Sequence, residues 1–215
     1  MNGNYKAEVA EALLKTGCVN VSPREPFTYA SGAQGPIYCD CRKLISYPKE
    51  RGLVAQSFVE LIKENNLEFQ HVAGMATAGI PHAAFLSEKL ETSMLYIRSS
   101  PKGHGLGKVI EGDFKEGDKG LMVEDLVNRA SSLDKVMPYV ENQKLNVEAV
   151  VSIVSYESPV AKENLSKWNL KLYSLTDIHS IATALEALSP DSFGSVEKES
   201  LLAWAQDPVS WKPLL

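Results

Sequence analysis

The sequence predicts an α/β fold: an open, mostly parallel, twisted sheet flanked by helices, with a small N-terminal hood made of a hairpin and a helix. Three observations favour this fold. From Pro48 onward, helical and strand-like patterns alternate along the chain. The segments 121–123 and 149–154 are short, apolar and rich in β-branched residues, as in a parallel sheet covered on both faces. The 215 residues, 44% of them hydrophobic, can bury one substantial core but are few for two full domains.

The elements follow from their periodicity. Residues 3–16 have apolar positions at helical spacing and stop at Gly17, which predicts an amphipathic helix. Strand-like pieces at 27–30 and 37–40 surround the turn-rich segment 31–36 and suggest a hairpin. We therefore expect a single domain over residues 1–215, with the hood contributed by about residues 1–45. The other expected elements are helices at 49–64, 79–90, 131–141 and after 159, strands at 71–74, 94–97, 121–123, 149–154 and 172–175, and a Gly-rich polar stretch at 98–118.

Composition argues against several classes of protein. A net charge of −5 and a pI of about 5.5 give no long-range attraction for a polyanion, so neither nucleic acid nor a membrane is an expected partner. No run approaches the ~20 apolar residues of a membrane helix, and the N-terminus lacks the apolar core of a signal peptide. Cys39 and Cys41 form a Cys-x-Cys pair, but no histidine or second pair has metal-like spacing, so zinc is not expected. With Cys18 they are expected to be reduced, in a cytoplasmic protein.

In open α/β sheets, ligands bind beyond the carboxyl ends of the strands, and three segments at such places have unusual residues. Residues 75–81 open a helix through small residues whose N–H groups could face an anion, although an ordinary tight turn explains them equally well. Residues 98–108 carry four potential cations among glycines. A solvated charged loop is the commoner explanation, but a loop that closes over an anionic ligand also fits.

The third segment is an acidic pair followed by polar residues. Glu124 and Asp125 end an apolar strand, and Asn128, Ser131 and Ser132 lead into a helix. A single acid here would indicate a helix cap. Two acids with amide and hydroxyl neighbours fit a sugar phosphate better, because carboxylates accept hydrogen bonds from vicinal hydroxyls and a helix N-terminus binds the phosphate.

With these segments, the chain resembles the orotate phosphoribosyltransferase family, especially its short bacterial form, which has the type I phosphoribosyltransferase fold. The resembling parts are the hairpin that helps enclose the base (26–32, 36–42 and 46–48), the pyrophosphate loop (76–82), the mobile catalytic loop (96–98 and 102–105) and the start of the phosphoribosyl pyrophosphate fingerprint (123–126). The resemblance covers most of the chain.

The resemblance implies an enzyme that joins orotate to phosphoribosyl pyrophosphate, giving orotidine 5′-phosphate and pyrophosphate on the way to UMP. It implies a homodimer that shares the mobile loop 98–111 between subunits, and Mg²⁺ held mainly by the substrate. Arg98, Lys102 and His104 are the implied catalytic residues, since they would stabilise the departing pyrophosphate. The implied phosphoribosyl pyrophosphate-binding residues are Thr77, Ala78, Gly79, Glu124, Asp125, Leu126, Val127, Asn128, Arg129, Ala130, Ser131 and Ser132, and Asn128 is also implied to contact orotate.

One segment departs from the family pattern. After the acids, members usually have Ser or Thr, then Thr, two glycines and Ser or Thr, whereas this chain has Asn128-Arg129-Ala130-Ser131-Ser132. Glycine reaches positive φ easily, and a β-carbon there adds ~1 kcal/mol or more. Arg129 could contact the 5′-phosphate or fill the pocket. Three functions therefore stay open: transfer to orotate, transfer to another nucleobase, and binding of phosphoribosyl pyrophosphate or a nucleotide without turnover.

Overall fold

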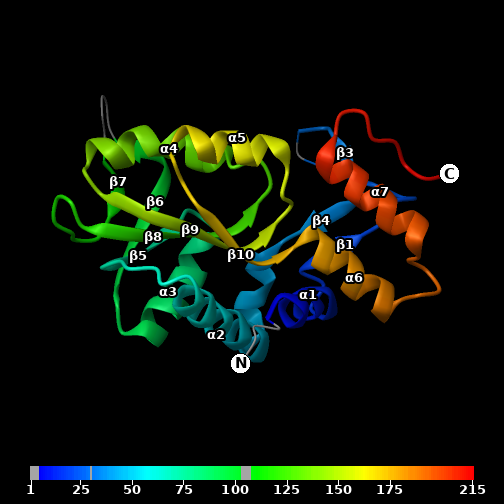
Figure 1. Ribbon diagram of the computed structural model, residues 1–215, viewed down its shortest axis with the longest axis horizontal. Coiled ribbons are helices and arrows are strands. Elements are labelled where there is room, and N and C mark those ends of the chain that lie inside the picture. Colours follow the sequence, from blue (N-terminus) through cyan, green and yellow to red (C-terminus); the bar gives the residue numbers. More distant parts are fainter. Residues whose placement is uncertain (1–4, 30, 103–107) are drawn as a thin grey trace.

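The centre of the protein is a six-stranded sheet that is parallel except at one edge (Figure 1). The computed structural model describes residues 5–29, 31–102 and 108–215. The strands lie in the order β10-β9-β8-β5-β6-β7, and of these only β7 runs antiparallel to its neighbour. The predicted open, mostly parallel sheet is confirmed. The strands are β5 (His71–Met75), β6 (Ser93–Lys102), β7 (Lys108–Glu111), β8 (Lys119–Val127), β9 (Asn146–Ser155) and β10 (Leu172–Asp177).

Helices cover both faces of the sheet because successive side chains of a strand point to opposite faces. Val72 and Val123 belong to the core cluster on one face of the sheet, whereas Ala73 and Met122 belong to a separate cluster on the other face. All four side chains are completely buried. Figure 1 shows the two helical layers on either side of the sheet. The first layer contains α1 (Tyr5–Lys15), α2 (Pro48–Glu64) and α3 (Gly79–Leu90), and the second contains α4 (Ser131–Asn142) and α5 (Pro159–Lys167).

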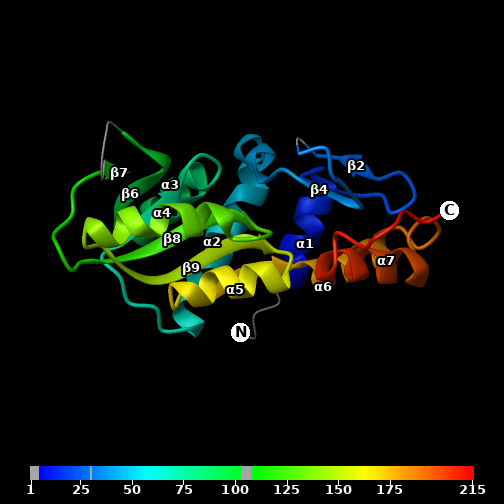
Figure 2. The same cartoon turned by 90° about the horizontal axis from the view of Figure 1, so that it is seen from above.

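The hood at one end of the molecule is built from both ends of the chain (Figures 1 and 2). Trp204 packs its ring against Tyr29 at 6.3 Å between centroids, and Arg24 donates to Glu197 at 2.8 Å, so the C-terminal helices hold the N-terminal strands. The hood contains β1 (Val19–Val21), β2 (Phe27–Thr28), β3 (Gln34–Gly35), β4 (Ile37–Cys39), the 3-10 helix η1 (Cys41–Ser46), α6 (Ile178–Leu188) and α7 (Ser195–Gln206). None of the described helices is long and apolar enough to cross a membrane.

The predicted hairpin is wrong in its pairing. Residues 27–28 pair with 34–35, which lie inside the predicted turn, and 37–39 pair with the unpredicted strand 19–21. The turn between these two strands is shorter than the predicted turn. It is stabilised by the Tyr29 N–H, which donates to the Ala33 carbonyl at 2.8 Å. A three-residue strand with a distant partner leaves little periodicity to detect.

The stretch predicted as an irregular loop at 98–118 is partly a hairpin. β6 continues to Lys102, and Lys108 to Glu111 pair back onto it with a register shift between Ile97 and Lys102. Val109 and Ile110 are buried, which explains why this glycine-rich segment gains a strand. Residues 103–107 lie outside the described part of the chain.

Gly79 gives a test of how closely α3 approaches the sheet. A β-carbon at Gly79 would lie 2.2 Å from the Val123 carbonyl oxygen, whereas a β-carbon at Gly52, in α2, would meet nothing within 4 Å. Gly79→Ala should lower the free energy of unfolding by about 2–3 kcal/mol through overpacking. Gly52→Ala, the matched control, should raise it by up to about 1 kcal/mol through helix propensity. Urea unfolding measures both, and equal effects of the two substitutions would contradict this packing.

Candidate functional site

The winding of the sheet reverses between β5 and β8. From β5 the chain passes through α3 to β6 on one side, while β8 lies on the other side of β5. Ligands of open α/β sheets bind at such a reversal, beyond the carboxyl ends of the strands. The loop 76–78 leads into α3 and the turn 128–130 leads into α4 at this edge. Two of the three predicted segments therefore lie at the reversal point.

The loop after β5 is fastened to the neighbouring strand. The Ala76 N–H donates to the Ile97 carbonyl at 2.7 Å, and the Ala76–Thr77 peptide is cis. Gly79 is buried at the first residue of α3, while Thr77 is exposed. The first N–H groups of a helix have no partner within the helix and carry partial positive charge. Thr77, Ala78 and Gly79 thus form an anion-compatible helix start.

Glu124 and Asp125 form an acidic pair in β8. The sequence predicts that the acids end the strand, but the strand continues to Val127 and the acids lie within it. The Glu124 residue is only 9% exposed. Burial, with the charge of Asp125, raises the pKa of Glu124 to about 8, and burial also raises the pKa of Asp125. A ligand that donates hydrogen bonds or brings positive charge would stabilise both carboxylates.

The turn after β8 presents its donors to a cavity. Three of its carbonyls are held from outside: the Tyr156 N–H donates to Val127 at 3.0 Å, Ser158 Oγ to Asn128, and Asn164 Nδ2 to Arg129 at 2.8 Å. In a trans peptide the N–H points opposite to the carbonyl. The N–H groups of residues 128–130 are thereby directed away from these partners. Residues 124 and 126–133 line a cavity of about 160 Å³.

The departure from the family pattern has a visible backbone consequence. Ala130, which stands at the first usual glycine position, adopts φ +53° and ψ +22° as it leads into α4. The left-handed conformation is therefore retained with a β-carbon, at a cost of about 1 kcal/mol. Ser131 begins α4, and the Arg129 side chain is exposed. Arg129 therefore does not fill the cavity as an occluding side chain.

A second small cavity adjoins the turn on the hood side. It has a volume of about 170 Å³ and is lined by Tyr29, Ile37, Tyr38, Cys39, Leu126, Asn128 and Tyr156. Asn128 lines both cavities, so it lies between them. The motif at 36–40 pointed to part of this wall. Tyr156 was missed, and the only signal for it was its position just after the apolar strand β9.

The predicted cationic residues lie after β6. Ile97 pairs with Met75, so Arg98 lies beside the loop that follows β5. The Arg98 guanidinium donates to Glu111 at 3.4 Å, across the β6–β7 hairpin. Lys102 ends β6, and His104 lies outside the described residues. Arg98 is thus the predicted cation whose backbone position the structure places next to the loop after β5, while its side chain contacts Glu111 of β7.

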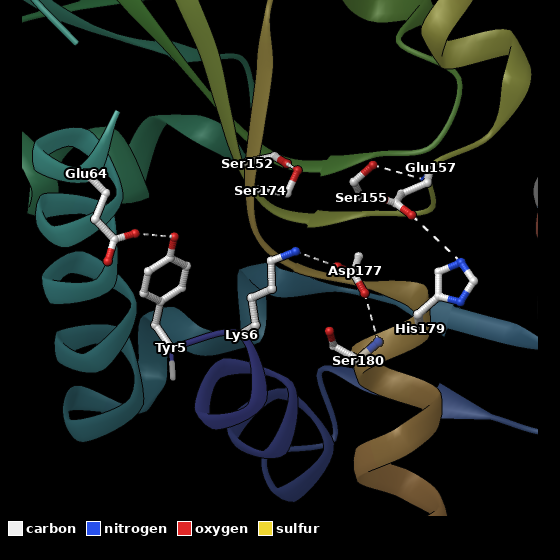
Figure 3. Close-up of polar contacts among 10 residues, drawn as sticks. All are labelled: Tyr5, Lys6, Glu64, Ser152, Ser155, Glu157, Ser174, Asp177, His179 and Ser180. Atoms are coloured by element: carbon white, nitrogen blue, oxygen red, sulfur yellow. Dashed lines mark hydrogen bonds and ion pairs between the residues drawn. The ribbon is translucent and has the colours of Figure 1, made fainter. Parts of the chain in front are cut away.

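A larger cavity of about 640 Å³ lies elsewhere, along the edge strand β10. Four of its polar side chains form two pairs: Lys6 with Asp177 at 2.9 Å, and Tyr5 with Glu64 at 3.0 Å (Figure 3). Figure 3 also shows His179 directed at Glu157, 3.8 Å away. None of the predicted site residues that the structure describes lines this cavity. The candidate functional site is therefore the one at the β5–β8 reversal.

Glu124 should make stability depend on pH. Below pH 4.5 its carboxyl is protonated in both folded and unfolded chains, but between about pH 4.5 and 8 it ionises only on unfolding, which lowers the free energy of unfolding. Glu124→Gln removes this loss of stability. The free energy of unfolding of the variant, relative to that of the natural chain, should therefore rise across that window by about 5 kcal/mol and then stay constant. Urea unfolding at several pH values measures the difference. Glu116→Gln, whose side chain is 71% exposed, is the control; a flat difference for Glu124→Gln would contradict the raised pKa.

Comparisons with known proteins identify the family of the chain. No protein-family model matches the chain. It is 37% identical over 210 residues to the orotate phosphoribosyltransferase of Coxiella burnetii, covering 98% of this chain and 100% of that one. It is 40% identical over 205 residues to the Bacillus cereus orotate phosphoribosyltransferase, covering 95% and 97%.

Solved structures give the same assignment. The UMP synthase of Leishmania donovani superposes with a TM-score of 0.79 at 26% identity, over 94% of this chain and 42% of that one. The orotate phosphoribosyltransferase of Aeropyrum pernix superposes with a TM-score of 0.68 at 25% identity, over 84% and 99%. With identity of 37–40% over nearly the whole length, the chain belongs to the orotate phosphoribosyltransferase family.

Proposed function

We propose that this protein transfers the 5-phosphoribosyl group from phosphoribosyl pyrophosphate to orotate, giving orotidine 5′-phosphate and pyrophosphate. The observation that carries the proposal is the joining, at the β5–β8 reversal, of a buried acidic pair with a turn that presents N–H donors. Family membership over nearly the full length supports orotate as the base.

The 5′-phosphate would occupy the cavity lined by residues 124 and 126–133. The N–H groups of the turn and the amino end of α4, a 12-residue helix, supply donors and partial positive charge. The exposed Arg129 guanidinium is free to add a charge-assisted hydrogen bond to a phosphate oxygen. These contacts would compensate for the two glycines that the turn lacks.

Glu124 and Asp125 would accept hydrogen bonds from the ribose hydroxyls. As the bond from the anomeric carbon to pyrophosphate breaks, positive charge develops on the ribose ring, and the nearby carboxylates favour it. Mg²⁺ would be held mainly by substrate oxygens and water, and the neighbouring acidic pair would add carboxylate oxygens on its protein side. When bound with the substrate, Mg²⁺ would neutralise charge on the pyrophosphate oxygens.

The departing pyrophosphate would be bound by the amino end of α3 and by the cations that follow β6. Thr77, Ala78 and Gly79 supply backbone donors, and Arg98 lies beside them. Lys102 and His104 complete the set of donors to the leaving group. Donors directed at developing negative charge are among the largest contributions to catalysis. Orotate would lie in the hood-side cavity, where Asn128 can contact both base and ribose.

Orotate consumption tests the proposed reaction. Orotate absorbance should fall when the protein is mixed with phosphoribosyl pyrophosphate and Mg²⁺. Asp125→Asn removes a carboxylate that favours the cationic ribose, so kcat/KM should fall about 100-fold. Asp113→Asn, at an exposed position before β8, is the control and should retain activity. Tight binding of phosphoribosyl pyrophosphate without any turnover at high protein concentration would instead indicate a binding protein.

We further propose a homodimer in which the loop 98–111, through Lys102 and His104, completes the site of the neighbouring subunit. Mixed dimers of Lys102→Ala and Asp125→Asn test this. If the loop acts across subunits, each hybrid has one site with both residues intact, so a 1:1 mixture that has exchanged subunits should recover about a quarter of wild-type activity. If the loop acts within its own subunit, no site is intact and activity stays at the level of the single variants, which would contradict the proposal.

A further inference from the structure

Two thiols lie together at the hood end of the candidate site. The Cys39 and Cys41 sulfurs are 3.6 Å apart. Residues i and i+2 of an extended segment project to the same side, and Asp40 between them is extended, with φ −137° and ψ +84°. Val19 pairs with Cys39, and the Asp40 N–H donates to the Cys18 carbonyl at 2.7 Å. The backbone is therefore held in the conformation that places the sulfurs side by side.

The two sulfurs have different surroundings. Cys39 is half-buried and lines the hood-side cavity together with Tyr29, Asn128 and Tyr156. Cys41 is completely buried, and its thiol donates to the backbone carbonyl of Asp125 across 3.9 Å. A reagent that enters the cavity meets Cys39 first. The pair thus connects the wall of the base cavity to the acidic segment.

Exposure distinguishes the two thiols. Thiolates, and not thiols, react with oxidants, and an oxidant attacks the sulfur that it can reach. Cys39, in the cavity wall, is the accessible sulfur of the pair, and the buried Cys41 sulfur lies behind it at 3.6 Å. Cys18 is buried, and the Thr16 hydroxyl donates to its sulfur at 3.1 Å.

We infer that Cys39 and Cys41 form an oxidation site for peroxides, which converts the pair into an intramolecular disulfide in the wall of the base cavity. The Cys39 sulfur, after losing its proton, attacks one peroxide oxygen and the O–O bond breaks. The other oxygen leaves with that proton as water, or as an alcohol from an organic peroxide, and Cys39 becomes a sulfenic acid. The Cys41 sulfur then attacks the Cys39 sulfur, and its proton leaves with the displaced hydroxide as water. Both thiols are oxidised by two electrons in total, and one peroxide is reduced.

The disulfide would change both sites that the pair connects. The sulfurs must come about 1.5 Å closer to reach a bond length of about 2 Å. Cys41 then loses its contact with the Asp125 carbonyl, and Cys39 changes the shape of the cavity. The effect of the disulfide on catalysis rests on the proposed function, whereas the oxidation itself does not.

Peptide mapping tests the oxidation without any activity measurement. Trypsin places Cys39 and Cys41 in one peptide, 25–42, and Cys18 in another, 16–24. After treatment of the full protein with hydrogen peroxide and alkylation of free thiols in denaturant, peptide 25–42 should be about 2 Da lighter than its reduced form and carry no alkyl group. Dithiothreitol should restore two alkylation sites. A cross-link between the two peptides, or two alkylated cysteines in 25–42, would refute the pairing.

Variants separate the roles of the sulfurs. Cys41→Ser should leave Cys39 as a sulfenic acid that dimedone traps, whereas Cys18→Ser, the matched control, should form the disulfide as the natural chain does. Cys41→Ala repeats the test in case the buried hydroxyl disturbs folding. Failure to label Cys39 in folded Cys41→Ser or Cys41→Ala would contradict the proposed order of steps.

Activity tests the consequence of the disulfide. Each variant is compared with its own reduced state. Peroxide should lower the orotate kcat/KM of the natural chain and of Cys18→Ser about tenfold, and dithiothreitol should reverse the loss. A disulfide found by mass with unchanged kcat/KM would overturn the coupling. If no variant turns orotate over, the proposed function fails, while the peptide masses still decide the oxidation.

Discussion

The close approach of α3 to β8 is the constraint on which the site depends. Only a residue without a β-carbon can stand at Gly79, because the Val123 carbonyl lies where that carbon would be. The amino end of α3 therefore lies against the strand position that precedes Glu124. One steric contact thus sets the separation between the anion-compatible helix start and the acidic pair, and a looser contact would move the two apart.

In the turn 128–130, the N–H groups are directed by hydrogen bonds to the carbonyls and not by the glycines that family members usually have. Its carbonyls are bound by partners outside the motif, from Tyr156, Ser158 and Asn164, so the direction of its N–H groups is set by the β9–α5 segment. Ala130 still adopts the left-handed conformation. In this chain, therefore, the partners of the carbonyls and not glycines fix the direction of the donors, and Ala130 adds only a backbone cost of about 1 kcal/mol. The departure from the family pattern is compatible with an intact phosphate cradle.

The sequence was informative where periodicity and local chemistry coincide. The alternation of Val72 with Ala73 is a local property, so the sheet and its two covering layers could be predicted. The pairing of strands that are far apart in the sequence could not be predicted. Strand 19–21 has three residues, and its partner follows 16 residues later, so the hairpin was assigned the wrong strands. Tyr156 and Trp204 enter the hood only through tertiary packing, 5.5 Å apart between ring centroids, and no pattern near them in the chain indicates it.

These distant segments meet at the hood-side cavity. Because the cavity is small, its shape depends on the position of each lining segment. The β1–β4 ladder fixes Cys39, the turn after β8 fixes Asn128, and the chain after β9 fixes Tyr156. A cavity of about 170 Å³ has little room to absorb a displacement of its lining. The rigidity that would orient a flat base also holds the two thiols within 3.6 Å of each other. Binding of the base and the redox state of the pair therefore share one set of backbone constraints.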